Sequence, residues 1–518
     1  MTEKSAARIG ILVVAYNART TLASVLDRIP VDFRSRVTKV LVSDDHSKDD
    51  TFQVGVEYLT GADIPIEVTY QPRNLGYGGN QKVGYHWAIA NDLDVVVLLH
   101  GDGQYAPELL ADMVAPIVEG DADAVFGSRM LTRGAAREGG MPAYKFWGNR
   151  TLTKLQNEMV GANLSEWHSG YRAYRVSALR EIPFERNDQG FRFDTQIILQ
   201  LIEAKKKIVE IPIPTFYGDE VCYVNGLKYG REIIADVTRY RAQKIGLGSG
   251  DLAFQSLFER PLGKAESEVV EQLRASRPLR ILNLSESFAP VSKALVAAGH
   301  EVLDIEALMG PAKGQTPSGV DLRLDDSIEE FELVTSMESA SFDVILAFDL
   351  LARVRDPERL LRALHQTLRP FGRLFTSVAN IEHWYSRIRI GVGQFDYDQR
   401  GSLDRSHVRL FSRRAMERLT TRAGWWIQEQ RSYGLPFDLL PVRSPQGGTG
   451  RSAPKWLRAI DAFCVKRWPS LFSYTYVHVL EPASPRSASR ASTANPEPAN
   501  IDIGVPEKIS ARGKNQRA

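Results

Sequence analysis

Short runs of apolar, mostly β-branched residues alternate with amphipathic stretches through the first half of the chain. Glycine, serine, asparagine or aspartate follows most of these runs. Strands that alternate with helices in this way are typical of βαβ units and a parallel sheet. The expected strands are 9–14, 37–42, 66–70, 95–99 and 208–216, with helices at 20–28 and 226–244 and another ending near 91.

The alternation starts again after a turn-rich break at 246–250, with strands expected at 279–284, 342–347 and 474–480. Beyond Pro482 the chain has no aromatic residue and cannot bury a core, so we expect disorder there. The pattern therefore predicts an α/β protein with two Rossmann-like domains. The expected segments are a first domain at 1–245, a linker at 246–277, a second domain at 278–482 and a tail at 483–518.

Composition narrows the functional classes. Across 518 residues, 65 Lys and Arg nearly balance 63 Asp and Glu, so the charge gives no reason to expect a nucleic-acid partner. Cys222 and Cys464 have no metal-ligand or disulfide spacing, which favours a reducing, cytoplasmic setting. We expect no signal peptide and no spanning helix, because no apolar stretch is long enough.

Carboxylates follow two of the expected strands. Asp102 comes directly after the apolar run 95–99, and Asp44 and Asp45 come after the run 37–42. In an open α/β sheet, ligands bind at the carboxyl ends of the strands. The two strand ends therefore predict one crevice lined by acids, which indicates metal-assisted chemistry.

Seven short motifs occur in a recognisable order: Ala15-Tyr16-Asn17, Asp44-Asp45-His46-Ser47, Asn74-Leu75-Gly76 with Gly78-Gly79-Asn80, Gly101-Asp102-Gly103-Gln104, Gly127-Ser128-Arg129, Ser169-Gly170-Tyr171-Arg172 and Ile211-Pro212-Ile213-Pro214. This set resembles family 2 glycosyltransferases of the GT-A fold, and most of all the polyprenyl-phosphate sugar synthases of the dolichyl-phosphate mannose synthase type. The resemblance covers roughly residues 9–240 and implies a nucleotide-sugar donor.

The resemblance also implies residue roles on the donor side. Asp102, with Gln104 as a further oxygen ligand, would hold Mg²⁺ or Mn²⁺ at the diphosphate. The positions that match donor-binding residues are Tyr16, Asn17, Asp44, Asp45, Asn74, Gly78 and Asn80. The chain departs from the family at His100, where the D-x-D motif has its first acid.

On the acceptor side, Arg129, Arg172 and Arg175 match positions that face phosphate groups in similar enzymes, and Arg172 joins Asp102 and Asp194 among the expected catalytic residues. A polyprenyl phosphate is already an anionic nucleophile. A glycan hydroxyl would need a base, and Asp194 is placed where hydroxyl-using relatives have one. Both acceptors stay open at this point.

Structural roles are the alternative for the same residues. Asp44 and Asp45 suit a helix cap, 74–80 suits a strand-to-helix turn, and His100 suits a core position. Asp194 also suits a helix cap, and Arg172 suits a surface salt bridge.

The helix expected at 228–244 carries apolar residues among basic ones, a pattern typical of peripheral membrane contact. A packed terminal helix is the alternative. We expect a cytoplasmic protein, peripheral at the inner face of the membrane or held there by a membrane partner.

Residues 279–480 resemble class I methyltransferases that bind S-adenosylmethionine, most clearly at 342–345, 368–374, 380–384 and 403–411. Glu306 matches the acid that binds the cofactor's ribose. The loop 282–289 has no glycine, and Ala352 and Arg353 replace a Glu-His pair, so we expect a domain that has lost its activity.

The leading interpretation is a metal-dependent glycosyltransferase acting on a polyprenyl phosphate or a surface glycan. A bifunctional glycosyltransferase and methyltransferase that modifies a polysaccharide is one alternative. A non-catalytic scaffold that binds nucleotides or glycans is another.

Overall fold

The computed structural model describes residues 6–215, 226–254, 263–285, 288–304, 339–443, 449–451 and 454–483. Glu306 and the expected tail from 484 onward lie outside these residues. The chain forms two compact units. The first contains residues 1–259, 393–405 and 435–460, and the second contains 260–392, 406–434 and 461–518.

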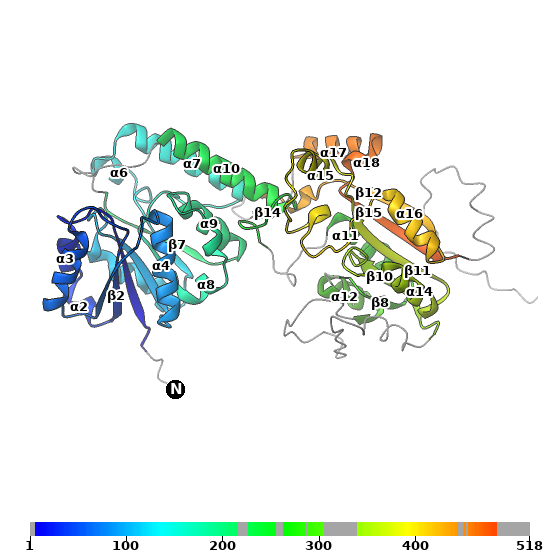
Figure 1. The fold of residues 1–518 in the computed structure, drawn as a ribbon, viewed down its shortest axis with the longest axis horizontal. Helices are drawn as coiled ribbons and strands as arrows, with labels where there is room; N and C mark the ends of the chain where they lie inside the picture. Colours follow the sequence, from blue (N-terminus) through cyan, green and yellow to red (C-terminus); the bar gives the residue numbers. More distant parts are fainter. Residues whose placement is uncertain are drawn as a thin grey trace, which may run out of the picture. The chain divides into compact units, whose positions relative to one another are not determined.

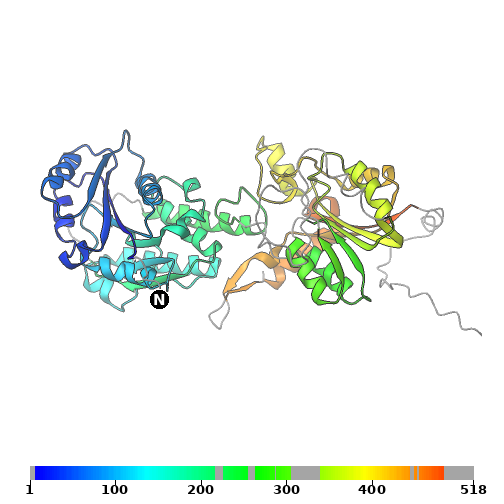
Figure 2. The same cartoon turned by 90° about the horizontal axis from the view of Figure 1, so that it is seen from below.

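The first unit is built on a seven-stranded sheet, drawn in blue to green in Figures 1 and 2. Its strands run in the spatial order β3-β2-β1-β4-β6-β5-β7, and all are parallel except β6. Their bounds are β1 Ile9–Ala15, β2 Val37–Asp44, β3 Ile66–Tyr70, β4 Val95–His100, β5 Ala124–Ser128, β6 Arg172–Arg175 and β7 Ile208–Pro212. The pattern along the chain predicted all of these strands except β5 and β6.

Helices cover both faces of this sheet. Those of the first unit are α1 Leu22–Asp27, α2 Val31–Arg34, α3 Thr51–Tyr58, α4 Tyr77–Ala90, α5 Leu110–Val118, α6 Ala135–Glu138, α7 Ala143–Val160, α8 Val176–Arg180, α9 Phe193–Glu203 and α10 Gly226–Lys244. The central strand β4 shows why both faces need cover. Val95, Val97 and Leu99 pack into one apolar cluster, and Val96 and Leu98 pack into another. Strands buried on both faces are typical of parallel sheets.

The second unit contains a six-stranded sheet in the order β12-β15-β11-β10-β8-β9, in which only β15 is antiparallel to its neighbours. Its strands are β8 Arg280–Asn283, β9 Glu301–Asp304, β10 Phe342–Phe348, β11 Leu368–Ala379, β12 Trp425–Tyr433 and β15 Thr475–Pro482. Its helices include α11 Lys264–Arg274, α12 Phe288–Ala297, α14 Pro357–Thr367, α15 Trp384–Gly391, α16 Arg413–Arg422 and α18 Pro469–Phe472. The expected two-domain α/β class is confirmed.

The units do not follow the expected boundaries everywhere. Helix α11 falls in the expected linker, yet its Val269, Val270 and Leu273 are buried in the core of the second unit. The segments 393–405 and 435–460 group with the first unit, although they fall inside the expected second domain. Leu440, from the second of these segments, is buried beside Ile245. The segment 435–460 carries the hairpin β13 Pro441–Arg443 with β14 Thr449–Arg451, and α17 Lys455–Arg467 begins there.

Candidate active site of the first domain

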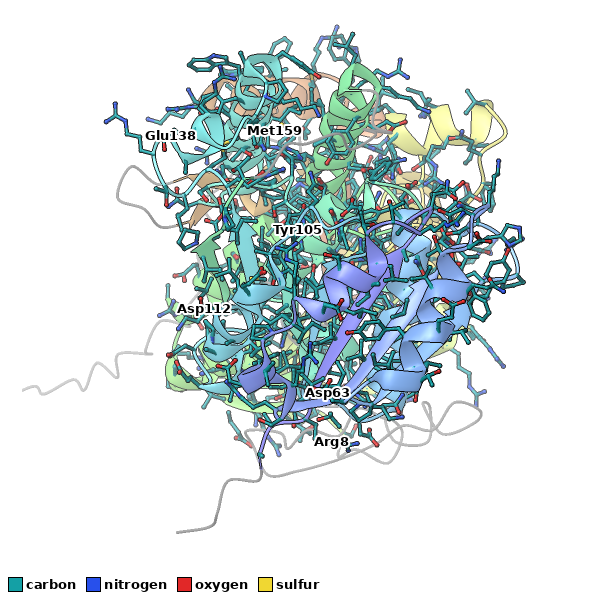
Figure 3. All side chains as sticks on the ribbon, turned by 90° about the vertical axis from the view of Figure 1, so that its left-hand side faces the viewer. Arg8, Asp63, Tyr105, Asp112, Glu138 and Met159 are labelled. Carbon is teal, nitrogen blue, oxygen red and sulfur yellow. The ribbon has the colours of Figure 1, made fainter. Side chains whose placement is uncertain are left out.

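The candidate site lies at one edge of the first sheet, where the carboxyl ends of β1, β2 and β4 meet. The register of β1 with β2 pairs Ala15 with Asp44, and its register with β4 pairs Val14 with His100. Strand β6 runs the other way, so the chain before it, around Gly170, comes to the same edge. The chain adds β2 and β3 on one side of β1 and then β4 on its other side. Open α/β sheets bind ligands where the order of strands switches in this way. Tyr105, which follows Asp102 by three positions in the sequence, is labelled in Figure 3.

Asp102 presents an exposed carboxylate at this edge. Its Oδ1 accepts a hydrogen bond of 3.0 Å from the backbone N–H of Gln104, and Gly103 makes the turn between them with a φ of 76°. Among the described residues, no protein group donates to its other oxygen. The carboxylate is therefore held in place with one oxygen open to a ligand.

The two acids after β2 have different environments. Asp44 is fully buried, and its Oδ1 accepts from the Ser47 N–H at 2.9 Å, whereas its Oδ2 has no partner in the described structure. Asp45 uses both oxygens on the loop that follows β3, accepting from Leu75 N–H at 2.6 Å and Gly76 N–H at 2.9 Å. Burial raises the pKa of Asp45 although these N–H groups oppose the shift. Asp44 thus has one buried oxygen without a partner among the described residues, and Asp45 fastens the loop.

Tyr16 and Asn17 follow β1. The Tyr16 ring is 37% exposed, which leaves a face for stacking against a base. Asn17 has a φ of 52°, and its Oδ1 accepts from the Lys48 N–H at 3.0 Å. Its backbone N–H donates to Ser47 Oγ at 2.8 Å, so Asn17 joins the ends of β1 and β2.

The glycine-rich segment after β3 makes internal contacts. Asn74 Nδ2 donates to the Asp45 carbonyl at 3.1 Å, and Asn80 Nδ2 donates to the Ser43 carbonyl at 2.8 Å. A Cβ on Gly78 would lie 2.6 Å from the Cβ of Phe193, so glycine is needed for α4 to pack here. The contacts of these three expected donor-binding residues match the alternative of a strand-to-helix turn.

Arg172 and Asp194 form a buried pair. Nη1 of Arg172 lies 3.4 Å from Oδ1 of Asp194 and donates to the Asp194 carbonyl at 3.0 Å. The guanidinium is 1% exposed, and it also donates to the carbonyls of Ser169 and Trp167. Burial acts to lower the pKa of Arg172, and the charge of Asp194 more than offsets this, so the pKa rises. The Arg172 guanidinium is therefore held in the interior by three carbonyls and one carboxylate.

Both oxygens of the Asp194 carboxylate have protein partners. Its Oδ1 also accepts from Gln81 Nε2 at 3.3 Å, and its Oδ2 accepts from the Tyr77 hydroxyl at 3.1 Å. The Tyr77 oxygen lies 3.3 Å from Nε2 of His100. Since the Tyr77 proton goes to Asp194, His100 donates from Nε2. Burial lowers the pKa of His100 although Asp102 and Asp194 oppose this, so the ring is neutral at pH 7.

Arg129 is buried against Glu166. Its Nε donates to Glu166 Oε1 at 3.0 Å, its backbone N–H donates to Oε2 at 2.7 Å, and Nη2 pairs with the same carboxylate. Charges nearby, Arg129 first among them, hold the pKa of Glu166 below its usual range against the effect of burial. Arg129 therefore organises the segment 165–168.

Arg175 lies at the opposite edge of the sheet. It is paired with Val95, the first residue of β4, and its Nη2 donates to the carbonyls of Ile117 and Ala122 at 2.8 Å. The antiparallel direction of β6 carries Arg175 away from Asp102, and its bonds match a structural role. A contact of Arg175 with the acceptor phosphate stays a prediction.

The residues present fit a divalent cation that takes most of its ligands from a diphosphate. The described part of the first unit has no group of three His, Cys, Asp or Glu side chains close enough to hold an ion alone. Mg²⁺ is usually bound through one or two carboxylates and substrate phosphates, so the exposed Asp102, with Gln104 close by, satisfies this requirement.

Three residues that the sequence reading left out belong to the site's framework. Tyr77 links His100 to Asp194, Glu166 neutralises Arg129, and the Tyr229 hydroxyl lies 2.9 Å from Nδ1 of His168. Nε2 of His168 is buried without a partner in the described structure, and burial lowers the pKa of His168 to about 4. Only Tyr77 carried a signal, because it follows the motif at 74–76.

In the second unit, an acid ends β9 beside the end of β8. Asp304 Oδ1 accepts from Asn283 Nδ2 at 3.1 Å and from the Ser292 hydroxyl, and burial raises the pKa of Asp304. The expected ribose ligand, Glu306, lies outside the described residues. After β10, Arg353 Nη2 contacts Asp349 at 3.0 Å.

Comparisons agree with this division of the chain. The family model described as Glycosyl transferase family 2 matches residues 10–183, and one described as Methyltransferase domain matches 268–430. The polyprenol monophosphomannose synthase of Mycolicibacterium smegmatis is 26% identical over 204 residues, which cover 39% of this chain and 75% of that protein. The undecaprenyl-phosphate mannosyltransferase of Micrococcus luteus is 29% identical over 241 residues, 45% of this chain and 93% of that protein. A solved structure of glucosyl-3-phosphoglycerate synthase from M. tuberculosis is 20% identical with a TM-score of 0.34, covering 45% of this chain and 80% of that one.

Proposed function

The N-terminal domain of this chain is a family 2 glycosyltransferase domain, and from that premise we propose that it transfers a sugar from a nucleotide sugar to a polyprenyl phosphate with a divalent cation at Asp102. The names of the relatives support the acceptor class, since two of them are a polyprenol monophosphomannose synthase and an undecaprenyl-phosphate mannosyltransferase.

The observation that carries the choice of acceptor is the state of Asp194. A glycan hydroxyl has to lose its proton during transfer and needs a carboxylate or another base to take it. Both oxygens of Asp194 are already engaged by Arg172, Gln81 and Tyr77. A phosphate monoester acceptor is ionised and needs no base. The geometry therefore favours a phosphate over a glycan.

On the donor side, we assign the recognition of the base to Asp44 and Tyr16. The free Oδ2 of Asp44 accepts an N–H or O–H from the nucleoside, and the exposed Tyr16 ring packs beside it. Asp45, Asn74 and Asn80 hold the surrounding loop in place.

Mg²⁺ or Mn²⁺, held by Asp102 and Gln104, would neutralise the charge that develops on the leaving diphosphate. His100 stands where the family motif has an acid, so this chain has one negative charge fewer beside the cation. The His100 ring also keeps the Tyr77 hydroxyl directed at Asp194. The acceptor phosphate attacks the anomeric carbon in line with the leaving diphosphate, which predicts inversion at that carbon.

The test measures nucleoside diphosphate release with Mn²⁺, a panel of nucleotide sugars and a polyprenyl phosphate. We expect one donor to give acceptor-dependent release, and Asp102→Asn to lower it at least about 100-fold. Asp63→Asn, a change to an exposed carboxylate paired with Arg34, is the matched control and should retain activity. Release that is the same in Asp102→Asn and the wild type would contradict the assignment.

No helix among the described residues is long and apolar enough to cross a membrane. We place the protein at the cytoplasmic face of the membrane, because its acceptor is a lipid and its cysteines lack disulfide spacing. The second domain has a methyltransferase-type match, and we propose that it has lost S-adenosylmethionine chemistry, since the loop at 282–289 has no glycine and Ala352 and Arg353 replace a Glu-His pair.

A further inference from the structure

Helix α10, for which the sequence left both membrane contact and packing open, turns its apolar side inward. Ile233 and Val237 are buried, and so is Tyr240 one turn later. The helix packs beside α7, with Gly230 close to Leu152 and the Arg241 guanidinium donating to the Met159 carbonyl. These contacts show that the two helices run parallel, as Figure 1 shows along the upper side of the first unit.

The exposed apolar residues lie instead where the two helices begin. On α7, the side of the helix that includes Thr153, Gln156 and Val160 is buried, and the opposite side starts with Tyr144, 74% exposed, and Trp147, 62% exposed. Leu227, at the start of α10, is 91% exposed. Because the helices are parallel, these three side chains belong to the same end of the helix pair. We call them the aromatic face.

Basic residues lie on the aromatic face or close to it in the sequence. Arg150 lies over the Trp147 ring, 5.9 Å from its centre, and Arg133 and Arg231 are exposed. The nearby Lys154 and Lys228 face Glu158 and Glu232, so these two pairs cancel. Glu138, labelled in Figure 3, also lies close by in sequence, on α6. The three arginines leave the surroundings positive.

The aromatic face is attached to the acceptor side of the site. Asn149, two residues after Trp147 on α7, donates to Glu166 at 2.7 Å, and Glu166 holds Arg129. On α10, Tyr229 holds His168. Both helix starts are therefore tied to the segment 165–171, which leads to β6 at the edge of the sheet that carries Asp102.

We propose that the aromatic face docks on an anionic lipid bilayer and so brings the site to its lipid acceptor. This inference rests on the proposed function. Tyr and Trp prefer the headgroup level of a bilayer because their rings are apolar and their O–H and N–H groups are polar. Exposed arginines are attracted to the negative lipid surface. A neutral bilayer lacks this second attraction.

The experiment is co-sedimentation of the full chain with vesicles of phosphatidylcholine and phosphatidylglycerol, or of phosphatidylcholine alone. We expect binding to the anionic vesicles that weakens at high salt, and a loss of at least about tenfold in Tyr144→Ser with Trp147→Ser. Both residues are exposed, so the variant should keep its melting temperature. Val31→Ser, at a residue that is 76% exposed on α2, is the matched control and should bind like the wild type.

Two results would overturn the proposal. One is a wild-type protein that ignores anionic vesicles, which would leave the aromatic face to a protein partner. The other is normal vesicle binding by the variant with Tyr144→Ser and Trp147→Ser, together with loss of binding in a variant with Trp456→Ser and Phe463→Ser. Trp456 and Phe463 lie on α17, and each is 64% exposed. Turnover of a short-chain, water-soluble acceptor separates this proposal from the proposed function, because the double variant should keep that turnover. If no protein shows turnover, the proposed function fails while vesicle binding still tests the aromatic face.

Discussion

Arg172 and Asp194, from β6 and α9, form an ion pair that is almost completely removed from solvent, with 3.4 Å between Nη1 and Oδ1. The pair fills the position where a hydroxyl-using glycosyltransferase would need a free base. The proposed choice of a phosphate acceptor rests on this pair, and the first prediction concerns it.

Asp194→Asn should lower the free energy of unfolding by about 3 kcal/mol, because it leaves the buried Arg172 without its counter-charge. Transfer to a polyprenyl phosphate by the folded protein should stay within about tenfold of the wild type, whereas loss of a general base costs about 100-fold or more. Urea unfolding and diphosphate release measure the two quantities. A stable variant without activity would assign the base role to Asp194.

Asp44→Asn and Asp45→Asn should have opposite signatures. Asp44→Asn should raise the KM for the nucleotide sugar about 10- to 100-fold, the cost of a hydrogen bond to a charged group, without loss of stability, because Oδ2 has no protein partner. Asp45→Asn should lower the free energy of unfolding by about 1 to 3 kcal/mol, because it weakens the bonds from Leu75 and Gly76. Steady-state kinetics and urea unfolding of both variants check this. Equal KM changes would contradict it.

Mn²⁺ should bind the free protein weakly and bind at least about tenfold more tightly when a nucleoside diphosphate is present, because the diphosphate supplies most of the ligands. Calorimetry with Mn²⁺ alone and with the diphosphate measures the difference. Asp102→Asn should remove it, with Asp63→Asn as the control. Tight binding of Mn²⁺ alone would show that the protein itself supplies more ligands than Asp102 and Gln104.

Acid should destabilise the second unit through His383 and His478. Both rings are buried with nitrogens that lack partners in the described structure, and burial lowers the pKa of each to about 4. Unfolded histidine takes up a proton near pH 6.5, so this stability is present above pH 6.5 and is lost as the pH falls towards 4. Each ring should cost about 2 kcal/mol between pH 7 and pH 5.

Urea unfolding at these two pH values tests this, with His478→Leu expected to remove about half of the combined loss. His86→Gln, a change at an exposed histidine, should leave the loss unchanged. An unchanged loss in His478→Leu would rule out this ring as a source.

S-adenosylmethionine should not bind with a Kd below about 1 mM, since the loop after β8 lacks the glycine that lets the backbone approach the cofactor. Calorimetry on the full chain gives the answer. A micromolar Kd would restore the bifunctional enzyme as an interpretation.

The sequence by itself determined the two α/β domains, most strands of the first sheet and the meeting of Asp44 with Asp102 at one edge. These follow from local patterns, because apolar periodicity sets the strands and the parallel order of strands sets the edge. Only the tertiary structure decided what each polar group does. Asp194 is engaged by Tyr77, 117 positions away, and Asp45 differs from Asp44 only because a loop about 30 positions away reaches it.

Tertiary structure also decided the position of Arg175 and the orientation of α10. One antiparallel strand moved Arg175 to the far edge, and packing against α7 turned the apolar side of α10 inward. Hydrogen bonds and burial join residues that are distant in the chain, so no local pattern records which donor, which oxygen or which helix face remains free.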